Sequence, residues 1–287
     1  MRILIAGLGL IGGSVCKALK KYTDHEVGGF DLNSNILKRA KKETTIDKAV
    51  YEKSKFIEYD CFILCINPLF VDGFMRDCDG CFSEKTIIAD VCGVKNDLPQ
   101  TMTEFCASRG LHYVSTHPMA GKERSGYENS SADLFLNANF IVTPVSDTDL
   151  NAMETVERIA CEIGFKNFIR ISPSEHDSVI AYTSQLAHVV SGAYVKSPMM
   201  EKEKGFTGGS FQDMTRIATM DEDLWSALFL LNKDKLISEI DILLENISLY
   251  KKALGESNEL ELKRLICESR VLKEKDLSNT KFLTRFD

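Results

Sequence analysis

Apolar residues in the first part of the chain come in short continuous runs, and segments with helical spacing separate these runs. A short apolar run bounded by polar or turn-forming residues is typical of a strand that is buried on both faces. Such runs predict strands at residues 3–6, 26–30, 60–66, 86–89, 111–115, 139–142 and 168–171. The segments between them predict helices from residue 11 onward and at residues 33–42, 98–108 and 151–163. This alternation predicts an α/β fold, a doubly wound Rossmann-type domain with a mostly parallel sheet, over residues 1–171.

The pattern changes at Ser172, after which strand-like runs disappear. Apolar residues then recur at three- and four-residue steps over residues 178–195 and 224–254, which predicts long helices. We therefore expect residues 172–287 to form an all-helical domain. A helix over residues 224–254 is longer than a small domain can readily cover, so we expect part of its apolar face to meet a second subunit in a homodimer. Burial of that face within one chain is the alternative.

Composition and charge narrow the possible partners. The chain has 287 residues and a net charge of −7, and it lacks a basic cluster with interleaved aromatic residues, so nucleic acid is not an expected ligand. The first residues enter a predicted core strand at once, which leaves no room for a signal peptide, and no apolar stretch approaches the ~18 residues of a membrane span. We therefore expect a cytoplasmic protein that binds neither nucleic acid nor a membrane.

Nine cysteines are present. Cys78 and Cys81 have the C-x-x-C spacing of many zinc sites, but no second pair and no paired histidines follow at a usual distance. Several of the others lie within or beside apolar runs, where cysteine packs as a small hydrophobic residue. We expect reduced thiols, no metal site and a reducing compartment.

The first strand, turn and helix carry a glycine motif. Gly7, Gly9 and Gly12 have G-x-G-x-x-G spacing directly after the first predicted strand. In such a turn the first glycine allows the tight turn, the second lets a pyrophosphate approach, and the third lets the helix pack close to the strand. Asp31 ends the next strand, where a carboxylate binds the ribose hydroxyls and repels a 2′-phosphate. We expect NAD to bind at Gly7, Leu8, Gly9, Leu10, Ile11, Gly12 and Asp31.

The segment after the predicted strand 111–115 contains residues suited to acid–base chemistry. It reads THPMAGKERSG over residues 116–126, so His117 follows the strand closely. Ligands of doubly wound sheets bind beyond the carboxyl ends of the strands. A histidine at this place can act as a general base near neutral pH, because its pKa lies close to that pH. A structural role for a lone histidine is the alternative.

Three ordered motifs extend this interpretation. They read Asp90-x-x-x-Val94-Lys95, His117-Pro-Met-Ala-Gly-x-Glu123-x-x-Gly126 and Gly208-Gly209-x-Phe211-x-Asp213-x-Thr215-Arg216-Ile217-Ala218. Together they resemble the motifs of the prephenate dehydrogenase family, and the resemblance extends over residues 2–254. It implies an enzyme of tyrosine biosynthesis that oxidatively decarboxylates prephenate or arogenate with NAD.

The resemblance implies a role for each matching residue. His117 matches the catalytic histidine that hydrogen-bonds the ring hydroxyl of prephenate, and Arg216 matches the arginine that binds a substrate carboxylate. Asp177 would pair with Arg216, and Asp213 is a weaker candidate for the same support. His188 matches a further catalytic histidine near the nicotinamide and the substrate. The other matches are Glu123, which guards the pocket, Trp225 in its wall, Gln185 beside the substrate, and Asp90 and Lys95, which frame the cofactor site.

Two positions depart from the family's pattern. Gly93 stands where many members have a serine that binds the histidine and the substrate hydroxyl, so His117 needs another orienting partner. Gln185 replaces a residue that is often histidine. Because arogenate carries an ammonium group where prephenate has a keto group, a neutral Gln185 favours prephenate, and Glu123 nearby weakens that preference.

Three functions stay open from the sequence. The first is prephenate dehydrogenase activity with NAD, with arogenate as the alternative substrate. The second is a β-hydroxyacid dehydrogenase with a similar two-domain architecture, although those enzymes usually work with a lysine on a helix and not with motifs like those of His117 and Arg216. The third is a non-catalytic NAD-binding sensor with the same fold.

Overall fold

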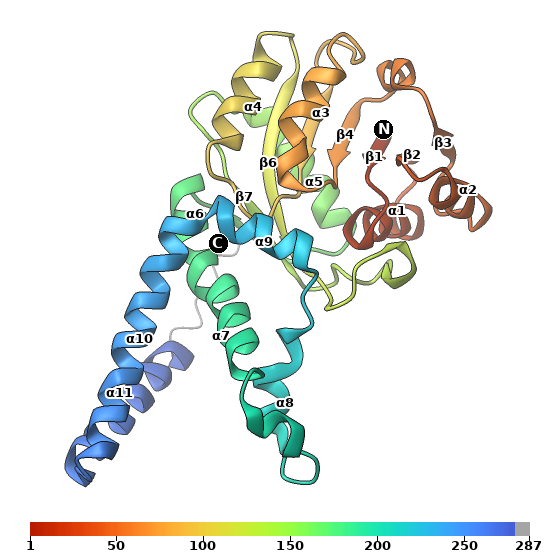
Figure 1. Cartoon of the computed structure of the whole chain (residues 1–287). Coiled ribbons are helices and arrows are strands. Elements are labelled where there is room, and N and C mark those ends of the chain that lie inside the picture. Colours follow the sequence, from red (N-terminus) through yellow and green to blue (C-terminus); the bar gives the residue numbers. More distant parts are fainter. Residues whose placement is uncertain (279–287) are drawn as a thin grey trace.

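The structure is a computed structural model that describes residues 1–278. One eight-stranded sheet forms the centre of the N-terminal domain, in the order β3-β2-β1-β4-β5-β6-β7-β8 (Figure 1). The strands are β1 (Arg2–Ala6), β2 (Glu26–Phe30), β3 (Lys48–Val50), β4 (Cys61–Leu64), β5 (Ile87–Asp90), β6 (His112–Met119), β7 (Asn139–Val142) and β8 (Asn167–Arg170). The sequence pattern predicts all of these strands except β3, which is short and carries an exposed lysine at the sheet edge. The expected α/β fold is confirmed.

Strands β1 to β6 run parallel, and β7 and β8 run in the opposite direction. β6 is long because it has two partners in succession: residues up to Ser115 pair with β5, and residues 116–119 pair with β7. His117 therefore lies within β6, opposite Ile141, and not in a loop after the strand as predicted. It is nevertheless just beyond the carboxyl end of β5, whose last residue Asp90 pairs with Ser115.

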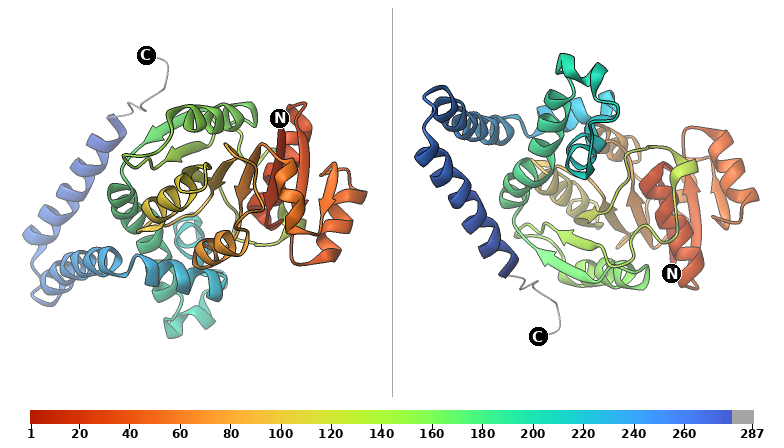
Figure 2. Two further views of the ribbon diagram at one scale, coloured as in Figure 1. Left: turned by 90° about the horizontal axis from the view of Figure 1, so that it is seen from above. Right: turned by 90° about the horizontal axis from the view of Figure 1, so that it is seen from below.

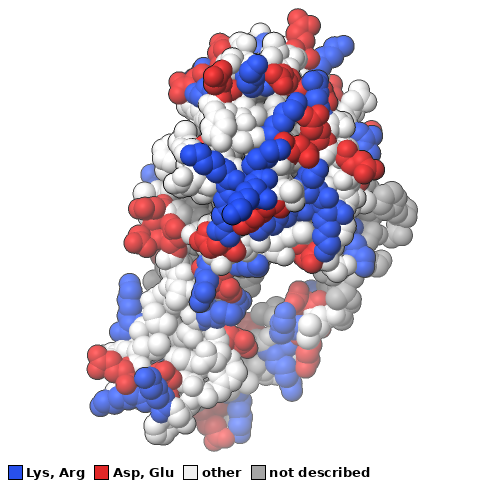
Figure 3. Space-filling view, turned by 90° about the vertical axis from the view of Figure 1, so that its right-hand side faces the viewer, with Lys and Arg blue, Asp and Glu red and all other residues white. Residues whose placement is uncertain are grey.

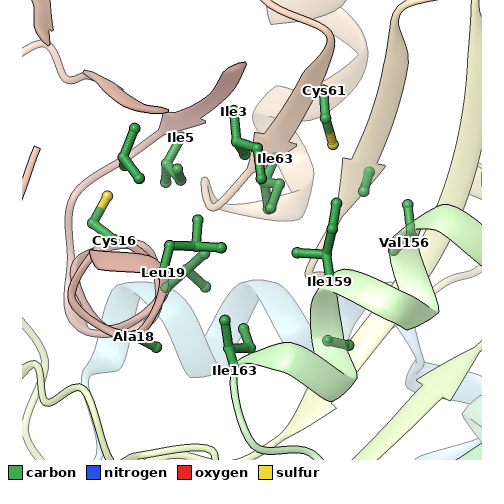
Figure 4. Packing of buried hydrophobic residues seen from close by; sticks show 14 of the residues in the cluster. Ile3, Ile5, Cys16, Ala18, Leu19, Cys61, Ile63, Val156, Ile159 and Ile163 are labelled. Carbon is green, nitrogen blue, oxygen red and sulfur yellow. The ribbon is translucent and has the colours of Figure 1, made fainter. Parts of the chain in front are cut away.

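Two hydrophobic layers cover the faces of the sheet. Helices α1 (Leu10–Tyr22), α2 (Ser34–Lys42) and α5 (Leu150–Glu162) cover one face, and α3 (Val71–Asp77) and α4 (Leu98–Ala107) cover the other. Figure 4 shows the first layer, in which Ile3 and Ile63 of the sheet pack in one cluster with Leu19 of α1 and Ile159 of α5. Leu4, the next residue of β1, belongs to the other layer, because successive side chains of a strand point to opposite faces.

The C-terminal domain is helical throughout the part that the structure describes, and α10 and α11 extend away from the sheet (Figures 1 and 2). Its helices are α6 (Pro173–Ile180), α7 (Leu186–Tyr194), α8 (Gly209–Thr215), α9 (Glu222–Leu231), α10 (Lys233–Gly255) and α11 (Glu259–Ser278). Ser172 caps α6, since its side chain accepts a hydrogen bond from the backbone N–H of Glu175. Residues 279–287 of the expected domain lie outside the described residues. No helix in the range 1–278 is both long and apolar enough to cross a membrane.

The single helix predicted at residues 224–254 is wrong, because the structure has two helices with a break at Asn232. The backbone of Asn232, with φ −118° and ψ 24°, leaves the helical conformation. Its buried side chain donates from Nδ2 to the carbonyl oxygen of Asp177 and to Oε1 of Gln185, both at 2.8 Å. The apolar spacing continues across the break, so the sequence pattern does not reveal it. The helix predicted at 178–195 is confirmed, since α6 and α7 are joined without a break by a π-helical turn (Ala181–Gln185).

Candidate active site

A cleft of about 550 Å³ lies between the sheet and the helical domain. Three segments at the carboxyl ends of β1, β4 and β5 line it, namely residues 9–11, 65–68 and 91–93. The loop after β6 and parts of α7, α9 and the turn before α9 complete the lining. Because ligands of doubly wound sheets bind beyond the carboxyl ends of the strands, this cleft is the candidate ligand site.

The turn after β1 has the geometry that the glycine motif predicts. Gly7 has a φ of +89°, which favours glycine, and a Cβ at Gly12 would lie 1.9 Å from the carbonyl oxygen of Gly7. The carboxylate of Asp31, at the end of β2, accepts hydrogen bonds from the backbone N–H groups of Leu8 (2.7 Å) and Asn33 (2.8 Å). These bonds hold the acid directly beside the turn.

The start of α1 is open to the cleft. Gly9 is the N-cap, no side chain caps the helix, and a Cβ at Gly9 would have no atom within 4 Å. The backbone N–H groups at this helix start are therefore available to an anion. Burial lowers the pKa of Lys17, Glu43 opposes this, and nearby Arg39 and Lys122 lower it further. Figure 3 shows Lys and Arg side chains gathered on the face that carries α1 and α2. The turn and the uncapped start of α1 fit the pyrophosphate of a dinucleotide.

Asp90 and Lys95 form a buried ion pair beneath the loop that contains Gly93. Nζ of Lys95 lies 2.8 Å from Oδ1 of Asp90, and both side chains are 0% exposed. Lys95 also donates to the carbonyl oxygen of Thr116, and the hydroxyl of Tyr113 donates to Oδ2 of Asp90. Burial alone would raise the pKa of Asp90, but Lys95 holds it below its ordinary value. Neither side chain lines the cleft, but the pair holds in place the loop of residues 91–93, which does; that Asp90 and Lys95 frame the cofactor site stays a prediction.

His117 is held from the helical domain. Its Nδ1 lies 2.9 Å from Nε2 of His176, and Nδ1 of His176 lies 2.8 Å from Oδ1 of Asp177. On the other side of the ring, a Cβ at Gly93 would lie 3.6 Å from Nε2 of His117, and Gly93 lines the cleft. His176 is therefore the orienting partner that His117 needs. The sequence interpretation missed His176, for which the only signal was its position next to Asp177.

The environment of His117 keeps its ring neutral. Burial lowers the pKa of His117 well below 6.5, the neighbouring Lys95 and His176 lower it further, and Asp90 opposes them. At neutral pH the ring is therefore an imidazole, with Nδ1 engaged by His176 and Nε2 next to the cleft. A neutral imidazole with one free nitrogen can accept a proton from a bound ligand.

Arg216 lies on the cleft, at the start of a short 3-10 turn (Arg216–Ala218) that follows α8. Its Nη1 forms an ion pair with Oε1 of Glu123, which also lines the cleft. This pair joins the loop after β6 to the helical domain. The Arg216 side chain is 62% exposed, so it is accessible to a ligand in the cleft.

Two residues predicted to support Arg216 lie elsewhere. Asp177 is buried, and its carboxylate accepts hydrogen bonds from the backbone N–H groups of Lys95 and Asn96 as well as from the histidine that precedes it. Asp213 is exposed on α8, and no hydrogen bond or ion pair within residues 1–278 joins it to Arg216. The predicted pairing of Asp177 with Arg216 is therefore wrong, and so is the predicted support from Asp213.

His188 and Trp225 form a stacked pair in the cleft wall, with ring centroids 3.6 Å apart and an interplanar angle of 29°. Nδ1 of His188 lies 2.9 Å from the carbonyl oxygen of Ser184 and donates to it, because a carbonyl can only accept. Burial lowers the pKa of His188, and the bond to Ser184 opposes this. Nε2 is therefore a free acceptor. Both residues that the resemblance places near the substrate line the cleft.

Gln185 is not on the cleft. It ends the π-helical turn (Ala181–Gln185) and is 1% exposed. Its Nε2 donates to the carbonyl oxygen of Leu228 and its Oε1 accepts from Asn232, both at 2.8 Å. Both ends of the amide are thus used within the protein. The prediction that Gln185 contacts the substrate and favours prephenate directly is wrong.

All nine cysteines are free thiols. Cys65 and Cys92 line the cleft, and burial raises the pKa of each, so both thiols are protonated at neutral pH. In the portion of the chain that the structure describes, no group of three or more His, Cys, Asp or Glu side chains is arranged to hold a metal ion. Polar side chains that line the cleft include Lys122, Glu123, His188 and Arg216, and Nε2 of His117 lies next to it at Gly93.

Known proteins match both domains. The family described as "Prephenate dehydrogenase, nucleotide-binding domain" matches residues 15–168, and the family described as "Prephenate dehydrogenase, dimerization domain" matches residues 172–268. Each match falls within one of the two domains of the fold. The two descriptions name parts of one type of protein.

Individual relatives agree with these matches. The prephenate dehydrogenase of Bacillus subtilis is 30% identical over 247 residues, which cover 83% of this chain and 66% of that protein, so the chain spans just under two thirds of this relative. The cyclohexadienyl dehydrogenase of Zymomonas mobilis is 29% identical over 269 residues, or 89% of each chain. The solved structure of prephenate dehydrogenase from A. aeolicus in complex with hydroxyphenyl propionate and NAD+ has a TM-score of 0.85 and 27% identity, and the alignment covers 96% of this chain and 98% of that chain. The chain belongs to the prephenate dehydrogenase family.

Proposed function

We propose that this chain catalyses the NAD-dependent oxidative decarboxylation of prephenate to 4-hydroxyphenylpyruvate and CO2, a step of tyrosine biosynthesis. One observation carries the proposal: a single cleft brings together the glycine turn, Gly93 with the adjacent His117, and Arg216. The reaction requires a dinucleotide site, a proton acceptor and a cation that binds a carboxylate, all at one cleft.

His117 is the proposed proton acceptor. NAD, when bound, takes a hydride from the ring carbon that carries the substrate hydroxyl. As that carbon becomes a carbonyl, Nε2 of His117 takes the hydroxyl proton. Loss of CO2 from the opposite ring carbon then sends an electron pair through the ring to the oxygen, which takes the proton back from His117. Because the ring becomes aromatic, the reaction is effectively irreversible.

Arg216 is the proposed binding group for a substrate carboxylate. Prephenate is a dianion, and a planar guanidinium can hold a carboxylate through two parallel hydrogen bonds. Glu123 already provides such a carboxylate to Arg216, so the substrate would take its place and Glu123 would guard the entrance. His188 and Trp225 would form the wall beside the ring, with Nε2 of His188 free to accept a hydrogen bond.

The proposed cofactor is NAD and not NADP. Asp31 lies at the end of β2 and bonds the backbone of Leu8 in the glycine turn, where it can bind both ribose hydroxyls and would repel a 2′-phosphate. The backbone of residues 7–12 would bind the pyrophosphate at the start of α1.

Residues 1–171 are proposed to bind the dinucleotide, and residues 172–287 to complete the substrate site and join two copies of the chain. Exposed apolar side chains on α10 support a homodimer; they are Ile237, Ile242, Leu244, Ile247, Leu249 and Leu254. The free thiols support a reducing compartment, which we take to be the cytoplasm. Nucleic acid and membranes are not proposed as partners.

The test is a turnover assay with purified chain, NAD and prephenate, in which the absorbance of reduced cofactor is followed. We expect turnover by the natural chain, and His117→Asn should lower kcat by about 10²-fold or more, as loss of a general base does. A parallel assay with arogenate decides between the two substrates. A folded chain that binds NAD but turns over neither substrate would refute the proposal and support the non-catalytic sensor.

A further inference from the structure

Two hydrogen bonds connect His117 to a buried carboxylate. Nδ1 of His117 lies 2.9 Å from Nε2 of His176, whose Nδ1 lies 2.8 Å from Oδ1 of Asp177. Both distances are those of direct hydrogen bonds. The connection crosses from one domain to the other, because His117 belongs to β6 and the other two residues belong to α6 (Figure 1). His176 and Asp177 are each 2% exposed, so solvent does not compete for these bonds.

The carboxylate end of this connection is fixed by further bonds. The backbone N–H groups of Lys95 and Asn96 donate to its two oxygens at 2.9 and 2.7 Å, and Nδ2 of Asn232 donates to the carbonyl oxygen of Asp177 at 2.8 Å. Burial alone would raise the pKa of Asp177, but the hydrogen bonds from His176 and the two N–H groups hold it below its ordinary value. Asp177 is therefore a carboxylate, which can only accept hydrogen bonds.

The positions of the ring protons follow from this carboxylate. Nδ1 of His176 must donate to it, and in a neutral imidazole the other nitrogen is then an acceptor. Nε2 of His176 therefore accepts the hydrogen on Nδ1 of His117. This leaves a lone pair on Nε2 of His117, the nitrogen that faces Gly93. Because residue 93 has no side chain, nothing there can hold the ring, and its orientation comes from His176.

We propose that His176 and Asp177 are positioning residues for His117: they fix its proton on Nδ1, leave Nε2 free for the substrate hydroxyl, and stabilise the imidazolium that forms when the proton arrives. This role rests on the proposed function. Neither residue contacts the substrate. Asp177 sets the tautomer of His176, and His176 sets the tautomer of His117.

The positioning role has a defined place in the reaction. The hydroxyl proton moves to Nε2 of His117, so the ring carries hydrogens on both nitrogens and a positive charge. The Nδ1–H then makes a charge-assisted hydrogen bond to His176, which is stronger than the bond that the neutral ring makes. When CO2 has left, the proton returns from Nε2 to the phenolate oxygen, and His117 is again neutral.

Kinetic variants test this role. In His176→Leu no acceptor remains for Nδ1 of His117, and we expect kcat to fall by about 10²-fold or more while KM for prephenate and Kd for NAD stay within about twofold. In His176→Gln the amide oxygen can accept in place of Nε2, so most of the lost kcat should return. The matched control is His25→Leu. His25 also bonds a carboxylate, that of Glu162 at 3.0 Å, but it lies between α1 and β2, away from the cleft. We expect this variant to leave kcat unchanged.

A spectroscopic measurement tests the tautomer without relying on turnover. Nitrogen-15 NMR of the labelled chain distinguishes protonated from unprotonated ring nitrogens, and His117→Asn assigns the signals of His117. We expect a hydrogen on Nδ1 and none on Nε2, both in the natural chain and in His176→Gln, whose amide oxygen accepts from Nδ1. A hydrogen on Nε2 in the natural chain would overturn the proposal, because His176 would then be the donor.

The outcomes separate this proposal from the proposed function. If the natural chain does not turn over prephenate, the proposed function fails, and the NMR tautomer still decides the positioning role. If turnover is normal but His176→Leu is folded and as active as the natural chain, the positioning role is refuted and the proposed function stands. If His176→Leu does not fold, His176→Gln decides. Near-normal kcat with a proton on Nδ1 of His117 supports the role. A fall in kcat as large as that of His117→Asn, in a folded chain, refutes it.

Discussion

Gly9 and Gly12 belong to one motif but are required for different reasons. A Cβ at Gly12 would clash with the carbonyl oxygen of Gly7. A Cβ at Gly9 would have no atom within 4 Å, and the φ of Gly9, −77°, is one that any residue adopts. We expect Gly12→Ala to lower the free energy of unfolding by about 1–3 kcal/mol or more, as overpacking does. Gly9→Ala should leave stability unchanged and raise the Kd for NAD by about tenfold, which equals about 1.4 kcal/mol.

Urea denaturation and a fluorescence titration with NAD measure these two effects on the same samples. Each variant is the control for the other, because the substitution is identical and the positions are three residues apart in one turn. Tight NAD binding by a folded Gly9→Ala chain would show that the open space at Gly9 is not where the pyrophosphate lies.

The protonation of His117 predicts how activity responds to pH. Its pKa in the folded chain is lowered from 6.5, first by burial and then by Lys95 and His176. The neutral, proton-accepting form therefore persists below pH 6.5, and kcat/KM should lose activity only as the pH falls through the lowered pKa. The unfolded chain binds this proton first, so the contribution of His117 to stability is complete above pH 6.5 and declines as the pH falls below it.

A pH profile of kcat/KM with prephenate measures the first effect, and an NMR titration of the His117 ring measures the pKa directly. The NMR control is His112, on the far end of β6 and partly exposed, which shows whether the whole chain unfolds in the same range. An acid limb of activity at or above pH 6.5 that follows the His117 titration would contradict the prediction.

At the scale of single residues, the sequence predicted the groups but not their partners. The glycine spacing and the match at His117 identify these residues because each is encoded within a few positions of the chain. The partner of Arg216 is Glu123, and the partner of His117 is His176, and both pairs join different domains. No local sequence pattern indicates which side chains contact each other across a domain boundary. The sequence therefore pairs Asp177 with Arg216, whereas the structure pairs it with His176.

At the scale of elements, the apolar pattern predicts strands better than helix ends. A buried strand needs a continuous apolar run, and such runs locate β4 and β5 to within a few residues. A helix break needs only one residue that bonds elsewhere. At Asn232 that bond goes to a different helix, so the spacing of apolar residues around it still predicts one continuous helix.

The break at Asn232 predicts a measurable loss of stability. In Asn232→Leu the carbonyl oxygen of Asp177 and Oε1 of Gln185 lose a buried donor, although leucine has the higher helix propensity. The carbonyl oxygen of Asp177 still accepts from the backbone N–H of Ala181, but Oε1 of Gln185 is left unpaired. One buried unpaired acceptor costs about 1–3 kcal/mol, so the free energy of unfolding should fall by about that amount. The control is Asn35→Leu at an exposed position of α2, which should change it by less than about 0.5 kcal/mol. Urea denaturation of both variants decides; equal stability would show that Asn232 does not maintain the break.

At the scale of the whole molecule, the site exists only where the two domains meet. The nucleotide-binding domain supplies the glycine turn, His117 and Glu123, and the helical domain supplies His188 and Arg216. The fold class follows from the sequence, because each domain has its own periodic pattern. The shape of the cleft does not follow from the sequence, because it depends on how the two domains pack against each other.

The exposed apolar face of α10 predicts that two copies of the chain form a dimer. Five apolar side chains of α10 are half exposed or more, although α11 packs beside this helix, and an exposed apolar face of this kind is typical of a subunit interface. We expect Ile247→Glu, which replaces a side chain that is 53% exposed, to shift the chain from dimer to monomer, since the interface would have to bury a carboxylate without a partner. Ile57→Glu is the matched control, because Ile57 is 51% exposed on the nucleotide-binding domain, and it should leave the assembly unchanged. Sedimentation equilibrium measures both variants beside the natural chain. A dimer that survives Ile247→Glu and dissociates with Ile57→Glu would place the interface on the other domain.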